Sequence, residues 1–244
     1  MKISIITISY NSEKTIEATI KSVLLQEGVT LEYIIIDGAS TDQTTSIIEK
    51  YKGKIHQYIS EPDQGIYDAM NKGIRLATGD VIGLLNSDDT YADPYVLEDV
   101  LKAIEHADAV YGDLEYVNGE TGKTIRNWKS GNYQPGDFFY GWMPPHPTFF
   151  VRKEVYDKWG LFRTDHGTAA DYEIMLRFVH KHQIKMHYLP KILVRMKIGG
   201  ASNVSWSKRW QANRLDKKSW QLNELQPKWY TLLLKPLRKV SQWL

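Results

Sequence analysis

The sequence has no cysteine, no long apolar run and no glycine-rich phosphate loop. Because cysteine is absent, disulfides and thiolate metal sites are excluded, and a reducing compartment such as the cytoplasm is favoured. No run of about 18 apolar residues occurs, so no segment is expected to span a membrane. The chain enters an apolar stretch at Ile3, directly after its start, so no signal peptide is expected. We therefore expect a soluble, cytoplasmic protein.

The absence of a glycine-rich loop limits which kinds of nucleotide-binding site the chain can form. After the first predicted strand the chain reads Ser9-Tyr10-Asn11-Ser12, which contains no glycine. The patterns G-x-G-x-x-G at this place and G-x-x-x-x-G-K-[ST] anywhere are both absent, which argues against a dinucleotide-binding protein and a P-loop protein. A bound phosphate must then be held by a metal ion and side chains.

The residues that are present are typical of an α/β protein. Of the 244 residues, 42% are hydrophobic and 25% are charged, which suits one large domain with an appendage. Strands are predicted at residues 3–8, 33–36, 55–59 and 81–85, and helical apolar stripes alternate with them. Because two of these strands are apolar on both faces, the pattern predicts a Rossmann-like, mostly parallel sheet with helices on both faces. The alternation breaks down after residue 112, which predicts a mixed α+β second half.

Carboxylates follow two of the predicted strands. Asp37 comes directly after residues 33–36, and Asp88 and Asp89 follow residues 81–85. In an open parallel sheet, ligands bind beyond the carboxyl ends of the strands, so these side chains should reach one edge. Asp88 and Asp89 repel each other, and Mg²⁺ or Mn²⁺ carried by a phosphate ligand would neutralise them. The alternative is local: Asp37 is a turn residue, and Asp88 and Asp89 form a solvated turn or cap a helix.

Asp171 is the candidate general base. It precedes a helical stripe that includes Ile174 and Phe178, so it lies in the first turn of a predicted helix, where the helix dipole favours a carboxylate. A side chain at a helix start is held rigidly and points out of the fold, which suits a general base at the mouth of a site. The alternative is that Asp171 is simply the N-cap of its helix.

Residues 137–147 are dense in aromatic rings and proline. The segment fits either an irregular part of the core or a wall of a sugar site, because the flat C–H faces of sugars stack on aromatic rings. Under the second alternative, Trp142 and His146 are candidate acceptor or sugar-contacting residues. A histidine in such a segment is more often a structural hydrogen-bonding group than a catalyst.

Five motif groups occur in an order that resembles a known family. They read Ser9-Tyr10-Asn11, Ile36-Asp37-Gly38-Ala39-Ser40-Thr41-Asp42, Asn71-Lys72-Gly73, Ala77-Thr78-Gly79-Asp80 with Leu85-Asn86-Ser87-Asp88-Asp89, and Ala170-Asp171-Tyr172-Glu173. From residue 2 to about residue 200, the sequence resembles a family 2 glycosyltransferase of the GT-A fold, of the type that builds bacterial polysaccharides.

The resemblance implies a role for each motif residue. Carried over, it assigns nucleotide-sugar binding to Ser9, Tyr10, Asp37 and Asp88, metal binding to Asp89, and base catalysis to Asp171. Tyr10 and Asp37 would contact the base, and Asp88 the ribose or the diphosphate. Many members of the family carry an acidic residue at the position of Asn86, so the metal falls here to the pair Asp88 and Asp89.

The implied reaction is inverting transfer of a sugar, of the hexosyl type, from a nucleotide-diphosphate donor. The acceptor would be a hydroxyl of a saccharide or a lipid-linked saccharide in cell-surface polysaccharide biosynthesis, Mg²⁺ or Mn²⁺ would be required, and no nucleic-acid partner is expected. Three other classes stay open. A catalytically silent nucleotide-sugar-binding protein would not need Asp89 and Asp171, a sugar nucleotidylyltransferase would need the missing glycine-rich loop, and an interaction protein would act through its basic C-terminus.

The last 40 residues differ from the rest in charge. Residues 205–244 hold nine Lys and Arg against two Asp and Glu, a net charge of +7, which leaves −5 on residues 1–204. The segment contains five of the eight tryptophans: Trp206, Trp210, Trp220, Trp229 and Trp243. Basic charge with tryptophan on an apolar helical face is typical of a segment lying in an anionic membrane surface, here the inner face of the cell membrane. The alternatives are packing on the catalytic domain or on a second copy in a homodimer.

These observations predict a catalytic domain over residues 1–204 and a helical tail over residues 205–244. Within the domain, residues 1–112 should form the nucleotide-sugar half and residues 113–204 the acceptor half.

Overall fold

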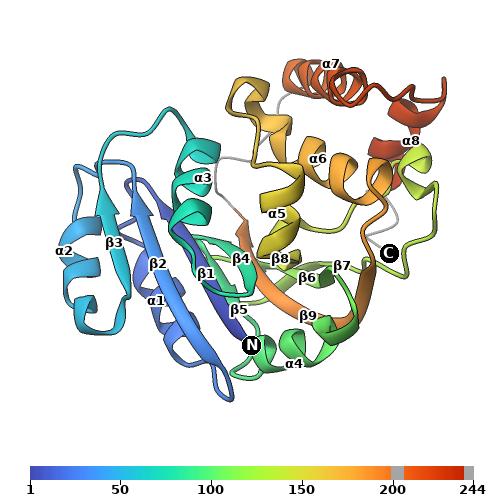
Figure 1. The fold of residues 1–244 in the computed structure, drawn as a ribbon. Coiled ribbons are helices and arrows are strands. Elements are labelled where there is room, and N and C mark those ends of the chain that lie inside the picture. The colour runs from blue at the N-terminus through green and yellow to red at the C-terminus, as the bar shows by residue number, and fades with distance from the viewer. Residues whose placement is uncertain (199–205, 239–244) are drawn as a thin grey trace.

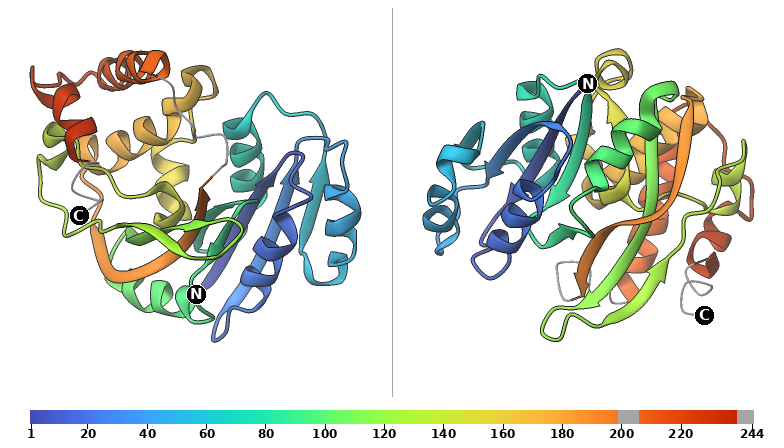
Figure 2. Two further views of the ribbon diagram at one scale, coloured as in Figure 1. Left: turned by 180° about the vertical axis from the view of Figure 1, so that it is seen from behind. Right: turned by 90° about the horizontal axis from the view of Figure 1, so that it is seen from below.

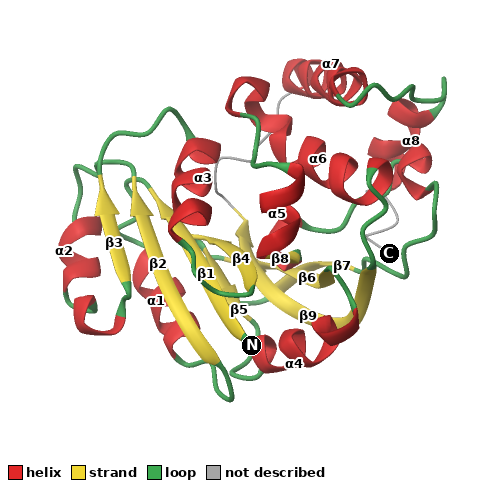
Figure 3. Ribbon diagram, viewed as in Figure 1, coloured by secondary structure: helices red, strands yellow, loops and turns green. Residues whose placement is uncertain are grey.

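A computed structural model of the chain describes residues 1–198 and 206–238. Its centre is one mixed sheet with the strand order β3-β2-β1-β4-β8-β6-β9-β5, and β7 pairs with β6 off this path. Helices cover both faces of the sheet (Figures 1 and 3). The predicted α/β class with a mostly parallel sheet in its first half is therefore confirmed.

The first half alternates strands and helices as predicted. The elements are β1 (Lys2–Ser9), α1 (Ile16–Leu24), β2 (Thr30–Asp37), α2 (Thr44–Glu49), β3 (Gln57–Ser60), α3 (Ile66–Leu76), β4 (Val81–Asn86), β5 (Asp89–Tyr91) and α4 (Val96–Ala103). Strands β1, β2, β3 and β4 pair in parallel. Each of the four predicted strands therefore exists within a few residues of its expected place.

Strand β1 shows why both faces of the sheet are covered. Ile3 and Ile5 join the core beneath α1 and α4, whereas Ile6 and Ile8 join the core beneath α3. Successive side chains of a strand point to opposite faces, so an all-apolar strand requires cover on both sides. Burying one isoleucine side chain stabilises the fold by roughly 1.5–3 kcal/mol, so this alternation accounts for much of the local stability.

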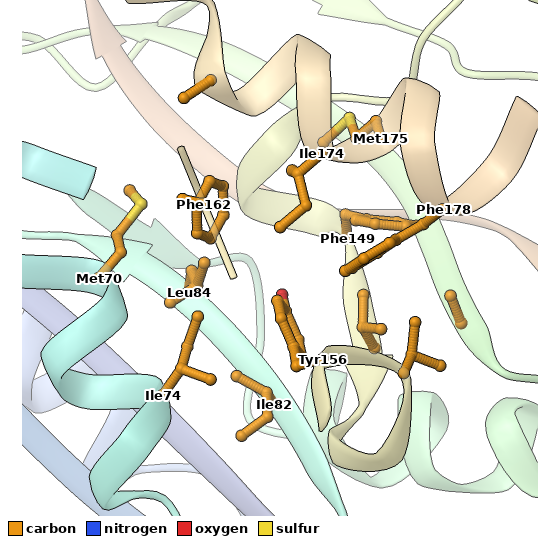
Figure 4. Close-up of a cluster of buried hydrophobic side chains, with 14 of the residues drawn as sticks. Met70, Ile74, Ile82, Leu84, Phe149, Tyr156, Phe162, Ile174, Met175 and Phe178 are labelled. Carbon is orange, nitrogen blue, oxygen red and sulfur yellow. The ribbon is translucent and has the colours of Figure 1, made fainter. Parts of the chain in front are cut away.

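The second half is mixed, as expected from the broken alternation. It contains β6 (Ala109–Asn118), β7 (Thr124–Trp128), β8 (Phe150–Arg152), α5 (Lys153–Trp159), α6 (Ala170–Met175), the π-helical turn η6 (Leu176–Lys181) and β9 (Met186–Ile198). Strand β8 joins it to the first half by pairing antiparallel with both β4 and β6. Figure 4 shows the shared core, in which Met70 and Ile74 of α3 lie near Phe162, Ile174 and other side chains of the second half.

Two helices follow the sheet. Helix α7 (Trp206–Leu222) lies beyond α6 on the side away from the sheet (Figures 1 and 2). Helix α8 (Thr231–Arg238) lies next to the 3₁₀-helix η3 (Asp137–Tyr140). Within residues 1–198 and 206–238, no helix is long and apolar enough to cross a bilayer. The predicted boundary at residue 204 and Trp243 lie outside the described residues.

The tail tryptophans have different surroundings. Trp220 of α7 is fully buried, so this part of the tail packs on the catalytic domain, which was one of the alternatives for it. Trp229, between the two helices, is 85% exposed, and Leu233 of α8 is 59% exposed. The packing alternative therefore holds for α7, and an exposed apolar surface remains near α8.

Candidate functional site

The carboxyl ends of the parallel strands lie level with one another. Ser60 of β3 pairs with Asp37 of β2, Asp37 pairs with Ser9 of β1, and Ile8 pairs with Asn86 of β4. The predicted convergence of the strand-end polar residues at one edge is therefore present in the register of the sheet. This edge is where an open α/β sheet binds its ligands.

Asp37 is buried at this edge, and both of its carboxylate oxygens are occupied. Oδ1 accepts hydrogen bonds from the hydroxyls of Ser9 at 2.9 Å and Ser40 at 2.5 Å. Oδ2 accepts from the backbone N–H of Ser40 at 2.9 Å and from the Ser60 hydroxyl at 2.8 Å. Four bonds fill the acceptor capacity of a carboxylate. Asp37 thus ties the turn after β2 to the ends of β1 and β3, and it has to exchange one serine to contact a nucleotide.

The side chains of Tyr10 and Asp63 both lie next to Gly38. The Tyr10 ring is 64% exposed, and a Cβ placed on Gly38 would lie 3.4 Å from Tyr10 Cδ2 and 3.1 Å from Asp63 Oδ2. An exposed ring beside a carboxylate suits a flat heterocycle that carries N–H donors. Asp63 was not among the predicted site residues. It follows β3, so the strand-end rule that selects Asp37 could also have selected it.

Asp88 and Asp89 differ in burial. Asp89, the first residue of β5, is fully buried, and Asp88 is half-buried. The Asn86 amide donates a long hydrogen bond of 3.4 Å to Asp89 Oδ2, whereas Asp89 Oδ1 and Asn86 Oδ1 are buried without a partner. Burial, and then the charge of Asp88, raises the pKa of Asp89 well above its usual value. Burial also raises the pKa of Asp88, and the Lys197 ammonium opposes both rises.

These orphaned oxygens fit a divalent cation. A buried carboxylate oxygen without a partner is costly unless a proton or a cation satisfies it. In the part of the chain that the structure describes, no group of three or more His, Cys, Asp or Glu side chains could hold a metal on its own. Mg²⁺ and Mn²⁺ suit such a site, because hard cations of this kind bind through one or two carboxylates and take substrate phosphates as further ligands. Asp89, with the neighbouring Asp88 and Asn86, is the candidate group for such an ion.

Asp171 lies at the same edge of the sheet. It is the second residue of α6, and the N-cap of this helix is Ala169. The alternative that Asp171 is the N-cap residue is therefore wrong. Its Oδ1 accepts from the backbone N–H of Tyr172 at 2.7 Å. Tyr67, near the start of α3, donates to the Thr168 carbonyl oxygen at 3.3 Å and so brings the start of α6 next to the donor half.

Tyr67 is a second residue that the sequence reasoning missed. Burial, and then the negative charge of Asp171, raises the pKa of the Tyr67 hydroxyl, which places that hydroxyl in the electrostatic field of Asp171. The Tyr67 ring stacks on Phe162 with 5.5 Å between centroids. The available signal was its place at the start of a helix that follows a strand end, four residues before the motif Asn71-Lys72-Gly73.

His146 also lies near Asp171. Its ring meets Phe162 edge-on at 5.8 Å, and its Nε2 atom is buried without a hydrogen-bond partner. Burial lowers the pKa of His146, and the charge of Asp171 acts in the opposite direction. A neutral imidazole with an unsatisfied nitrogen can bind a substrate hydroxyl. His146 therefore remains a candidate contact for the sugar or the acceptor.

Trp142, in contrast, belongs to the core. Its side chain is 3% exposed, its Nε1 donates to the Ser130 carbonyl at 2.9 Å, and it packs edge-on against Tyr111 and Phe138. A ring enclosed in this way offers no face to a sugar. The expectation that Trp142 contacts the acceptor is therefore corrected to the core alternative.

The motif Asn71-Lys72-Gly73 on α3 joins the two halves. Asn71 exchanges two hydrogen bonds with the backbone of Phe162, at 2.8 and 3.0 Å. Lys72 contacts Asp63 at 2.6 Å and Glu61 at 2.8 Å, and so holds the loop that carries Asp63. A Cβ at Gly73 would lie 2.3 Å from Ile6 Cγ2, so only glycine allows α3 to approach β1 this closely. The motif therefore positions the site rather than reacting in it.

Known proteins are similar to this chain in sequence. An uncharacterized glycosyltransferase of Mycobacterium tuberculosis is 32% identical over 186 residues, which cover 72% of this chain and 68% of that protein. The PGL/p-HBAD biosynthesis glycosyltransferase of Mycobacterium bovis BCG is 27% identical over 207 residues, covering 82% of this chain and 78% of that protein.

Two solved structures show the same fold across 99% of this chain. S. aureus TarS 1–349 in complex with UDP-GlcNAc superposes with a TM-score of 0.72 at 22% identity, over 73% of its own length. The mannosyltransferase PcManGT from Pyrobaculum calidifontis, in complex with GDP-Man and Mn²⁺, superposes with a TM-score of 0.63 at 16% identity, over 69% of its length.

The family profile described as Glycosyl transferase family 2 matches residues 4–178, which is well over half of the chain. The match spans the strand-end carboxylates, the motif on α3 and Asp171. The chain therefore belongs to glycosyl transferase family 2 and is a nucleotide-sugar-dependent glycosyltransferase.

Proposed function

We propose that this enzyme transfers a hexosyl group, with inversion, from a nucleotide-diphosphate sugar to an acceptor hydroxyl in cell-surface polysaccharide biosynthesis. The observation that carries the proposal is the buried pair of orphaned oxygens on Asp89 and Asn86 at the ligand-binding edge. A buried carboxylate oxygen without a partner is costly, and a cation that accompanies a diphosphate would satisfy it, which supports a metal site at this edge.

The donor half would hold the nucleotide. Tyr10 would stack on the base. Asp37 would exchange one of its serine contacts for an N–H group of the base while Ser9 keeps it in place, and the neighbouring Asp63 would accept a second N–H group. Asp88 would bind the ribose or the diphosphate. Asp89, with Asp88 and Asn86, would hold Mg²⁺ or Mn²⁺, which when bound supplies Lewis-acid neutralisation of the leaving diphosphate.

Asp171 would act on the acceptor. One of its oxygens is oriented by the Tyr172 amide, which leaves the other to accept the proton of the acceptor hydroxyl. An ordinary aspartate is a weak base for an alcohol, but the hydroxyl acidifies as it bonds to an oxocarbenium-like carbon, so late proton transfer suffices. Attack in line with the departing diphosphate inverts the anomeric carbon. Positioning of the reactants and general base assistance of roughly 10²–10⁴-fold would supply much of the rate.

Relatives support the substrate class. Of the two solved structures, TarS is a complex with UDP-GlcNAc and PcManGT is a complex with GDP-Man and Mn²⁺. The mycobacterial relative is named as a biosynthesis glycosyltransferase. By analogy we assign a nucleotide-diphosphate hexose as donor and a saccharide or lipid-linked saccharide as acceptor.

A membrane location is part of the proposal. Exposed Trp229 directly follows Lys228 in the basic tail, and exposed Leu233 lies in α8 of the same tail. Tryptophan, an apolar side chain and positive charge together suit an anionic lipid surface. A cytoplasmic enzyme attached in this way to the inner face of the membrane would meet a lipid-linked acceptor there.

A donor screen tests the function. UDP-, GDP- and dTDP-linked hexoses are incubated with the enzyme, with and without Mn²⁺. Donor hydrolysis, in which water takes the place of the acceptor hydroxyl, is measured as nucleotide release. We expect Mn²⁺-dependent release from one donor class, abolished in Asp89→Asn and strongly reduced in Asp171→Asn. Binding without any release would favour a silent nucleotide-sugar-binding protein. Release of pyrophosphate from a nucleoside triphosphate and a sugar phosphate would favour a nucleotidylyltransferase.

A further inference from the structure

The helix that carries Asp171 is poorly stabilised by itself. Helix α6 has six residues, no side-chain N-cap, and passes directly into the π-helical turn η6. Helices of this length are marginal in water, so tertiary contacts must fix their position. The preceding turn also changes direction at Gly167, where φ is 57° and ψ is −142°.

Helix α7 contacts the two residues that follow Asp171. The indole N–H of Trp220 donates to the Tyr172 hydroxyl at 2.9 Å, and both side chains are buried. The Asn223 amide, just after α7, donates to Glu173 Oε1 at 3.0 Å. A third contact joins His166 Nε2 and the Ser219 hydroxyl at 2.7 Å, directly before α6.

Glu173 extends this contact into the acceptor half. Its fully buried carboxylate pairs with Arg177 through two hydrogen bonds of 3.1 Å, and Arg177 also donates to the Leu161 carbonyl at 2.7 Å. The neighbouring Phe162 contacts Tyr67 and His146, both near Asp171. The contacts of α7 and of Asn223 therefore lead to the surroundings of Asp171 in two ways, through Tyr172 and through Glu173.

The path to Asp171 itself is short. Trp220 fixes the side chain of Tyr172, and the backbone N–H of Tyr172 orients the Asp171 carboxylate at 2.7 Å. The family match ends at residue 178, so these partners come from a segment beyond it. A displacement of about 1 Å in a reacting group can cost about 10²-fold in rate, so small shifts of α6 would matter.

We propose that Trp220 and Asn223 are positioning residues that set the place of Asp171 for proton transfer. This inference rests on the proposed function, in which Asp171 is the base. On this inference, the end of α7 orients the catalytic base of the acceptor half in addition to packing on it.

The test is a double-mutant cycle measured with the donor that the screen identifies. Trp220→Phe keeps an aromatic ring but removes the indole N–H together with part of the buried ring volume. Asn223→Ala removes the contact to Glu173. The matched control is Gln221→Ala, an exposed position between them. Each variant is assayed well below its Tm. We expect kcat to fall by about 3- to 30-fold in the first two variants, with donor Kd and the control unchanged, because a small displacement of the base lowers only the chemical step.

The cycle separates positioning from simple loss of structure. In an Asp171→Asn background the same two changes should have no further effect, because no base remains to be positioned. An equal fold-loss in both backgrounds, a parallel loss of donor affinity, or an unchanged kcat in both variants would each overturn the inference. Full turnover in Asp171→Asn alone would instead show that the base assignment in the proposed function is wrong, and the inference would fall with it.

Discussion

The Asn86 amide reaches one oxygen of Asp89 at 3.4 Å, and the other oxygen of this buried carboxylate has no partner. The arrangement leaves the metal-free protein with an unfavourable group in its interior. The neutral Asn86 amide also avoids a third carboxylate, which would add to the repulsion between Asp88 and Asp89. The melting temperature should therefore change when the proposed metal site is filled or altered, and it can be measured without an acceptor.

Asp89→Asn should stabilise the metal-free protein at pH 8 and abolish its response to Mn²⁺. The raised pKa of Asp89 means that its contribution to stability is present below the unfolded pKa and is lost as pH rises through the folded pKa. Asparagine does not ionise, so the variant does not lose stability in this way as pH rises. Differential scanning fluorimetry without metal should give a Tm at or above wild type, and the difference should shrink as pH falls. A metal-free variant clearly less stable than wild type would contradict this account.

The stabilisation of wild type by Mn²⁺ should decline as pH is lowered. Burial raises the pKa of both Asp88 and Asp89, so protons compete with the metal at higher pH than for ordinary aspartates. At 100-fold excess over Kd a ligand adds about 2.7 kcal/mol to stability, which is readily measured as a Tm shift. The affinity for Mn²⁺ is measured by titration at several pH values between 5 and 8, a range in which ordinary aspartates are already ionised. We expect the affinity to fall as the pH is lowered. An affinity that stays constant over this range would show that other residues bind the metal.

Asp171→Asn should lose roughly 10²–10⁴-fold in kcat while it binds the donor normally. The substitution keeps the shape of the side chain, and the proposed nucleotide contacts belong to the other half. A group that acts only in the transition state lowers kcat and kcat/KM together. Calorimetric donor affinity and steady-state rates decide the matter, with exposed Asp157→Asn on α5 as control. A matched loss of donor affinity would make Asp171 a binding residue.

Glu173→Ala should destabilise the protein by about 3–5 kcal/mol, because it leaves Arg177 with an unpaired charge beside its buried partner site. The exposed fraction of the Glu173 side chain is 0% and that of Arg177 is 11%, so solvent screens the pair little. Urea unfolding provides the measurement. The matched control is Glu49→Ala, whose pair with Lys52 is exposed and should contribute less than about 1 kcal/mol. Equal losses for the two variants would show that the buried pair has no special role.

Trp229→Ser combined with Leu233→Ser should reduce binding to anionic vesicles without loss of stability, since both side chains are exposed. Sedimentation with phosphatidylglycerol vesicles should recover wild type in the pellet at low salt, and less as salt rises. Truncation of the whole tail is the poorer experiment, because it also removes buried Trp220. Equal recovery in the supernatant with anionic and neutral vesicles would exclude the membrane proposal.

The first half of the fold could be read from the sequence because its signals are local. A strand such as β1 is apolar at nearly every position, and this pattern alone requires cover on both faces. The same pattern places Asp37, Asp88 and Asp89 at strand ends, and a parallel sheet brings strand ends to one edge. The resemblance to the family then supplied roles that spacing could not.

The tertiary structure decided whatever depends on contacts between distant residues. Sequence could not tell whether Trp142 packs or binds, because both uses need the same ring. It gave no sign that Trp220 would reach Tyr172, or that Tyr67 would lie beside Asp171, because these contacts span 48 and 101 to 104 positions of chain. Local sequence specifies which residues form an element and which face is apolar. Only the packed structure specifies which partner covers that face and which buried oxygen is left without one.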